Sequence, residues 1–184
     1  MKYLMLIRHA KSDWGNAELS DHDRPLNERG LRAAPIVGRF LARTYLGAGG
    51  TPAVLPALEA VVSSTATRAQ QTTQLLIEAM QIDASQVSLE ESVYLAEPKT
   101  LLHLVREFPA NQDHVAMVGH NPGMMDFVNR LVDKTKINEM PTCAVALIQL
   151  GDSWQETDWG QGRLLGFVTP RLIEKRFMNE TMGV

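Results

Sequence analysis

The chain has 184 residues, of which 45% are hydrophobic and 21% charged, a balance that is typical of ordinary soluble domains and excludes a disordered chain or a coiled coil. Its formal net charge of -3 comes without any run of like charges, so a nucleic-acid-binding surface is not expected. Cys143 is the only cysteine, which excludes an internal disulfide and a thiolate zinc cluster and agrees with a reducing compartment.

The length fits one domain with a real hydrophobic core, and we expect a single domain over residues 1–184. The first apolar stretch, residues 4–7, ends at Arg8. It is too short for the core of a signal peptide and far too short to cross a bilayer. We therefore expect a cytoplasmic protein without a membrane partner.

Short apolar segments alternate with segments of helical periodicity along most of the chain. Because the apolar runs are nearly continuous, they favour strands that are covered on both faces. The alternation predicts an α/β fold: a three-layer sandwich with a mostly parallel central sheet flanked by helices. The expected strands are 2–7, 60–63, 87–89, 114–118 and 144–150, and the expected helices are 27–45, 66–80, 99–108 and 122–132.

Proline and glycine mark the breaks between these elements. Pro35 falls inside the first helical pattern, where it removes a backbone donor, so we expect a kink or a second helix that starts there. The stretch from Gly47 is rich in glycine and proline and predicts a surface connection. The polar stretch from Gly151 predicts a hairpin between two late strands.

Three polar clusters follow predicted strands. They are Arg8-His9, the stretch "SSTATRAQQT" around Arg68, and "VGHNPG" around His120. In an open α/β sheet, ligands bind at the carboxyl ends of the strands. Any one of these residues also suits a purely structural role, but two arginines and two histidines at one edge favour a functional site.

The predicted helix starts point to an anion at this edge. With Ser64 or Thr65 as the cap, Arg68 lies in the first helical turn, where the helix dipole disfavours a cation. A bound anion would reverse that penalty, because helix N-termini and guanidinium groups both bind oxyanions. Asn121 would cap the later helix and Pro122 would open it, which directs a second N-terminus at the same edge.

A metal site is not expected from the histidine spacing. No pair of histidines has a ligand spacing such as H-E-x-x-H, and the arginines would repel a metal cation. The five histidines are His9, His22, His103, His114 and His120.

Together, "LIRHAKSDW", "SSTATRAQQT" and "VGHNPG" resemble the motifs of the histidine phosphatase superfamily, the RHG-motif group that includes the cofactor-dependent phosphoglycerate mutases. The closer resemblance is to its small SixA-type branch, the phosphohistidine phosphatases. It covers residues 1 to about 150, with Ala10 in place of the glycine of the motif. The resemblance implies a phosphoglycerate mutase-like fold and a mechanism without a cofactor.

The resemblance also implies that His9 attacks phosphorus while Arg8, Arg68 and His120 hold the equatorial oxygens. The chemistry is consistent with this. A phosphoryl group carries roughly -1.5 to -2 charges, so catalysis consists mainly of positioning and charge neutralisation. Two guanidinium groups and a protonated His120 would supply it, and a neutral imidazole with a pKa near ~6.5 is a usable nucleophile.

The general acid is ambiguous. Relatives that act on phosphate esters use a carboxylic acid between the second and third motifs, where Glu90 and Glu91 are the candidates and Glu91 is preferred. Both also suit a solvated strand end. A phosphohistidine leaves as an imidazole, a better leaving group than an alkoxide, so such a substrate needs no strong acid.

Several loop residues complete the prediction. The Ser12 hydroxyl and the Asn121 backbone N–H could bind phosphate oxygens, although both residues also suit turns. Trp14 is a candidate for the rim of the substrate mouth, while Asp23 and Arg24 resemble a recurring stretch of the branch or simply shape their loop.

The expected function is a metal-independent phosphatase with a phosphorylated protein as its partner, most directly one that carries phosphohistidine. The chain has little room for a lid, which suits a protein-borne phosphate or a variety of small phosphates. Two alternatives stay open. One is a phosphatase or mutase that acts on a small phosphorylated metabolite, and the other is a module that senses phosphate without turnover.

Overall fold

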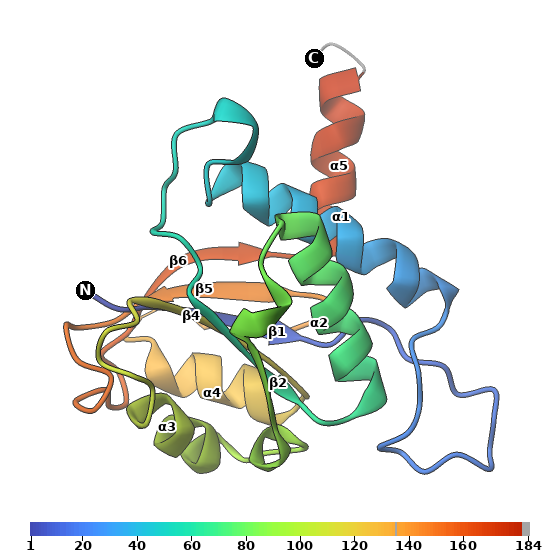
Figure 1. Ribbon diagram of the computed structural model, residues 1–184, viewed down its shortest axis with the longest axis horizontal. Helices are drawn as coiled ribbons and strands as arrows, with labels where there is room; N and C mark the ends of the chain where they lie inside the picture. The colour runs from blue at the N-terminus through green and yellow to red at the C-terminus, as the bar shows by residue number, and fades with distance from the viewer. Residues whose placement is uncertain (135, 182–184) are drawn as a thin grey trace.

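The computed structural model describes residues 1–134 and 136–181. Its central sheet has six strands in the order β3-β2-β4-β1-β5-β6 (Figure 1). The first four strands in that order run parallel, whereas β5 is antiparallel to both of its neighbours. The strands are β1 (Tyr3–Arg8), β2 (Ala60–Ser64), β3 (Val87–Glu90), β4 (His114–Gly119), β5 (Val145–Gln149) and β6 (Arg163–Val168).

Helices cover both faces of this sheet. In Figure 1, α1, α2 and α5 lie on one face, and α3 and α4 lie on the other. The mostly parallel, three-layer α/β fold is therefore confirmed. In the described part of the chain the α-helices are α1 (Glu28–Thr44), α2 (Thr67–Met80), α3 (Pro98–Arg106), α4 (Gly123–Leu131) and α5 (Pro170–Thr181).

The central strands are buried because their side chains alternate between two hydrophobic cores. Leu4 and Leu6 of β1 enter the core beneath α3 and α4, while Met5 and Ile7 enter the core beneath α1 and α2. All four side chains are at most 1% exposed. Full burial of each such side chain stabilises the fold by about 1.5–3 kcal/mol. The continuous apolar pattern of residues 2–7 has this cause.

At Pro35 in the first helix, one of the two alternatives expected from the sequence, a second helix that starts there, is wrong. The helix runs from Glu28 to Thr44 as one element, so a second helix does not start at the proline. The Asn27 side chain caps it by accepting from the Gly30 N–H at 3.0 Å. Ala34, Val37 and Leu41 are fully buried on the apolar face of the helix, and their packing offsets the roughly 3 kcal/mol that an interior proline costs.

The last helix, α5, was not predicted. Pro170 stands at its first position, which suits a helix start, but few apolar residues follow it. Of residues 170–176, only Ile173 is buried, in the core beneath α1. In the described residues, no helix combines the length and the apolar composition that a membrane span requires.

A tight contact between α1 and the segment after β1 gives a stability test. A methyl group at Gly30 would overlap the backbone carbonyl oxygen of Lys11. Gly30→Ala should therefore lower the free energy of unfolding by roughly 1–3 kcal/mol, measured by urea denaturation. Gly151→Ala is the matched control, because a methyl group there meets open space. Equal stability of the two variants would contradict this packing.

Candidate active site

The strand order brings the three predicted polar clusters to one edge of the sheet. Strands β2, β4 and β1 are neighbours, and Arg8 is paired with Gly119. The His9 N–H, just beyond β1, donates to the Gly119 carbonyl at 3.0 Å. As a result the rings of His9 and His120 lie 5.0 Å apart between centroids. The parallel pairing of these strands therefore forms the site.

His9 is held as a neutral imidazole with a defined tautomer. Its Nδ1 lies 2.7 Å from the Ala10 carbonyl, which can only accept, so Nδ1 carries the hydrogen. Its Nε2 then keeps a lone pair, which accepts from the Arg68 Nε–H at 3.3 Å. Burial lowers the pKa of His9 to about 4, helped by the charges of Arg68 and Arg8. The Nε2 lone pair, which faces Arg68, is the nucleophile that this geometry offers.

His120 presents a hydrogen-bond donor rather than a charge. The Ser64 hydroxyl accepts from the Ala66 N–H at 3.3 Å and lies 2.7 Å from His120 Nε2. Because Nε2 is the one acceptor described for the Ser64 hydroxyl, we assign this hydroxyl as the donor and place the ring hydrogen on Nδ1, which is buried and has no partner among the described residues. Burial lowers the pKa of His120 to about 3, with further contributions from His9 and Arg68. His120 is therefore uncharged at neutral pH in this structure, and a His120 that is protonated when it holds a phosphoryl group stays a prediction.

Arg68 connects His9 to a carboxylate that the sequence analysis did not single out. Its side chain is buried, and its Nη1 and Nη2 donate to the Asp21 carbonyl and to Asp21 Oδ2, the latter at 2.9 Å. The Tyr94 hydroxyl donates to the same Oδ2 at 2.7 Å. The Tyr94 hydrogen bond, followed by Arg68, keeps the pKa of Asp21 below its usual value. No sequence spacing links Asp21 or Tyr94 to Arg68, because the path of a loop brings them together.

The start of α2, just before Arg68, differs from the sequence expectation because a loop contacts it. The N-cap of α2 is Ala66 rather than Ser64 or Thr65, and the Thr67 N–H donates to the His22 carbonyl at 3.0 Å. The Thr65 hydroxyl bonds instead to His22 Nε2 at 3.0 Å. The loop that carries His22 thus occupies one backbone N–H of the helix start, and the binding of an oxyanion beside Arg68 stays a prediction.

The start of α4 also differs from expectation. Pro122 is the N-cap, the helix begins at Gly123, and the Asn121-Pro122 peptide bond is cis. The Asn121 side chain does not cap the helix, because its Oδ1 accepts no hydrogen bond from a described residue, and its Nδ2 donates to the Met140 carbonyl at 2.9 Å. The Arg8 Nη1 donates to the same carbonyl at 2.8 Å. Met140 therefore links the side chains of Arg8 and Asn121.

The remaining predicted residues are divided between the site and the surface. Ser12 is buried in a bridge with Leu26, and its hydroxyl has no hydrogen bond to a described residue, so it is available to a ligand. Glu91 is exposed, and within residues 1–134 and 136–181 its carboxylate makes no hydrogen bond or ion pair. Glu90 accepts from the Ser92 N–H and hydroxyl, at 3.1 and 2.6 Å. The roles of Glu91, Ser12 and Asn121 stay predictions.

Several buried polar atoms at this edge lack a hydrogen-bond partner among the described residues. Buried polar groups are nearly always hydrogen-bonded, so exceptions require an explanation. Arg8 Nε, His120 Nδ1 and Asn121 Oδ1 are buried and lack a partner in the described part of the protein. Two of these are donors beside His9, which is the arrangement that an oxyanion would satisfy.

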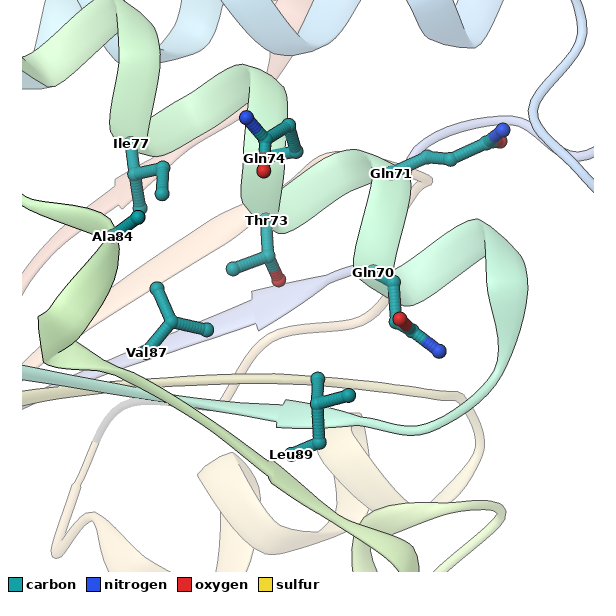
Figure 2. Close-up of a pocket in the computed structure, with 8 residues that line it drawn as sticks. All are labelled: Gln70, Gln71, Thr73, Gln74, Ile77, Ala84, Val87 and Leu89. Carbon is teal, nitrogen blue, oxygen red and sulfur yellow. The ribbon is translucent and has the colours of Figure 1, made fainter.

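A separate groove of about 420 Å³ between α2 and β3 lacks these features (Figure 2). No titratable side chain lines it, so it offers no acid, base or nucleophile. Its lining residues are Gln70, Gln71, Thr73, Gln74, Ile77, Ala84, Val87 and Leu89. The polar edge of the sheet is therefore the better candidate. Across residues 1–134 and 136–181, no three His, Cys, Asp or Glu side chains gather in a way that would hold a metal ion.

Comparison with known proteins agrees with the motifs. Residues 4–94 match the model of the histidine phosphatase superfamily (branch 1). An uncharacterised protein of Mycobacterium tuberculosis is 32% identical over 174 residues, which cover 90% of this chain and 100% of that protein.

Solved structures are similar over nearly the whole chain. A protein from Nakamurella multipartitia, assigned as phosphohistidine phosphatase SixA, is 27% identical with a TM-score of 0.75, covering 92% of this chain and 96% of its own. The protein histidine phosphatase SixA in complex with tungstate also has a TM-score of 0.75, covering 93% of this chain and 99% of its own. At 18% identity, that second likeness concerns the fold alone.

The buried imidazoles predict a pH dependence of stability. His9 and His120 have folded-state pKa values of about 4 and about 3, whereas an unfolded histidine has a pKa near ~6.5. The unfolded chain therefore binds protons first, and the free energy of unfolding should fall as the pH is lowered from about 6.5 to 4. Urea denaturation at several pH values measures this.

Removal of either ring should flatten that dependence. His9→Gln and His120→Gln should each lose less stability between pH 6.5 and 4 than the wild type does. His103→Gln is the control, because the His103 side chain is 74% exposed. If all three variants kept the wild-type slope, the two site imidazoles would not be buried and neutral.

Proposed function

This chain belongs to the histidine phosphatase superfamily and is a phosphatase, and we propose that it hydrolyses protein phosphohistidine through a phosphohistidine intermediate on His9. One observation carries the proposal. The Nε2 lone pair of a neutral His9 lies 3.3 Å from the Arg68 Nε, beside the unpartnered donors of Arg8 and His120. A nucleophile and three groups that could donate hydrogen bonds to an oxyanion thus lie at the same edge of the sheet.

In the first step, His9 Nε2 attacks phosphorus and the bond to the leaving group breaks. Arg8, Arg68 and the Nδ1–H of His120 donate to the phosphoryl oxygens as negative charge spreads over them. The Arg68 Nε–H, which occupies the Nε2 lone pair in this structure, turns to a phosphoryl oxygen. The His9 ring then carries positive charge, which its Nδ1 hydrogen bond to the Ala10 carbonyl stabilises.

In the second step, water attacks phosphorus and the bond to His9 Nε2 breaks. The electron pair returns to Nε2, the imidazole becomes neutral, and the proton of the attacking water passes to the released phosphate. The His9 Nδ1 keeps its hydrogen and donates it to the Ala10 carbonyl throughout. The ring therefore returns in the tautomer of the first step.

Phosphohistidine is the substrate class that the site supports best. Glu91, the preferred general acid, is exposed and makes no hydrogen bond or ion pair to a described residue. A phosphate ester needs an acid to protonate its alkoxide, whereas an imidazole leaves without one. The similarity to the protein from Nakamurella multipartitia that is assigned as phosphohistidine phosphatase SixA supports the same substrate class. A panel of phosphohistidine protein, sugar phosphates and phosphoglycerate separates this proposal from a small-metabolite phosphatase or mutase.

Loss of the nucleophile is the direct test. His9→Ala should lower turnover by at least about 10³-fold, since no covalent intermediate can form. Mass spectrometry of acid-sensitive phosphoenzyme, trapped during turnover, should place the phosphate on His9 of the wild type. His103→Ala is the matched control, because that exposed histidine lies on α3.

Two outcomes would contradict the mechanism. Full activity in His9→Ala with retained phosphate binding would favour a module that senses phosphate without turnover. Loss of all wild-type turnover in EDTA would show that the chemistry requires a metal ion.

The role of Glu91 has its own test. With a phosphohistidine substrate, Glu91→Gln should change kcat less than about twofold, because the leaving imidazole needs no acid. With phenyl phosphate the same variant should lose roughly 10- to 100-fold if Glu91 is the acid for esters. Glu90→Gln serves as the neighbouring control. An equal loss on both substrates would show that Glu91 also serves the phosphohistidine reaction.

A further inference from the structure

Asp21 has one carboxylate oxygen available to a ligand. Its Oδ2 accepts from Arg68 Nη2 at 2.9 Å and from the Tyr94 hydroxyl at 2.7 Å. Its Oδ1 has no donor among the described residues, and the side chain is 43% exposed. Asp21 takes no part in the two steps of the proposed hydrolysis. A carboxylate with a free oxygen therefore stands beside an arginine that holds the phosphoryl group.

The position of Asp21 is fixed by the loop on either side of it. The His22 carbonyl accepts from the Thr67 N–H at 3.0 Å, and His22 Nε2 bonds to the Thr65 hydroxyl at 3.0 Å. The His22 ring also packs edge-on against Tyr94, with centroids 4.9 Å apart. These contacts hold the Asp21 carboxylate next to Arg68 as a fixed negative charge.

A fixed negative charge at this place discriminates between leaving groups. The free Asp21 Oδ1 is an acceptor and offers no hydrogen to an ester oxygen that gains negative charge as its bond to phosphorus breaks. It attracts a phosphohistidine ring whose second nitrogen is protonated, because that ring is cationic and has one N–H to donate. We propose that Asp21 Oδ1 accepts this hydrogen bond and so selects phosphohistidine over phosphate esters. The inference rests on the proposed function and adds the residue that recognises the leaving group.

The step balances without proton transfer from Asp21. The phosphorus–nitrogen bond breaks, its electron pair goes to the leaving nitrogen, and the new bond forms to His9 Nε2. The departing ring keeps the proton on its other nitrogen and leaves as a neutral imidazole. Asp21 remains a carboxylate throughout, as its hydrogen bonds from Tyr94 and Arg68 require.

The test compares kcat/KM for two probes, a phosphohistidine peptide and phenyl phosphate, in three proteins. Asp21→Asn should lower the preference for the phosphohistidine peptide by about tenfold, the effect of losing one hydrogen bond to a cation. Asp23→Asn is the matched control, because Asp23 lies in the same loop but bonds to Ser20 and His22. Its preference should stay within about twofold of the wild type.

Two results would overturn the inference. An unchanged preference in Asp21→Asn would show that the carboxylate does not meet the leaving group. An equal loss on both probes would show that Asp21 only positions Arg68. Either result leaves the proposed function intact, whereas absence of phosphohistidine turnover and of phospho-His9 in the wild type would refute the function itself.

A wild-type measurement covers the case in which Asp21→Asn does not fold. 4-Methylimidazole at pH 6, largely protonated, should inhibit turnover of phenyl phosphate at concentrations at least about tenfold lower than phenol does. Equal inhibition by the two compounds would contradict a carboxylate that recognises the imidazolium.

Discussion

The proton on His9 Nδ1 determines what the rest of the site can do. The Ala10 carbonyl holds that proton, and burial beside two guanidinium groups prevents a second proton from binding Nε2. A lone pair therefore faces Arg68 at neutral pH without a metal ion or an external base to create it. The same burial makes His120 a neutral donor, so both imidazoles act through hydrogen bonds and lone pairs rather than through charge.

Much of this arrangement could be predicted because it follows directly from strand ends. Arg8 and His9 close β1, and His120 closes β4, its neighbour in the sheet. Arg68 enters from the helix after β2, which lies on the other side of β4. Buried parallel strands are visible as apolar runs, and their carboxyl ends must meet. The proximity of these four residues could therefore be predicted without knowledge of loop geometry.

The features that were missed depend on how loops and helix ends pack. Asp21 and the contact at the N-terminus of α2 arise from the loop that returns from Ser12 to Leu26, and Tyr94 reaches Asp21 from the segment between β3 and α3. The charge state of His120 depends on its burial, which a sequence motif does not report. The alternative of a second helix start at Pro35 failed for a related reason, since tertiary packing of the buried face of α1 outweighs the local cost of the proline.

The balance of charge also has a consequence for turnover. Arg8 and Arg68 contribute two positive charges, Asp21 contributes one negative charge, and the two histidines are neutral. A site with two arginines and a protonated histidine would bind a dianionic phosphate strongly in substrate and product alike, which gains nothing in kcat. With the Asp21 carboxylate sharing the Arg68 fork, the donors of that arginine already have an acceptor when phosphate leaves. Because Asp21 holds the two terminal nitrogens of Arg68, the Nε–H beside His9 is the donor of that arginine that faces the nucleophile.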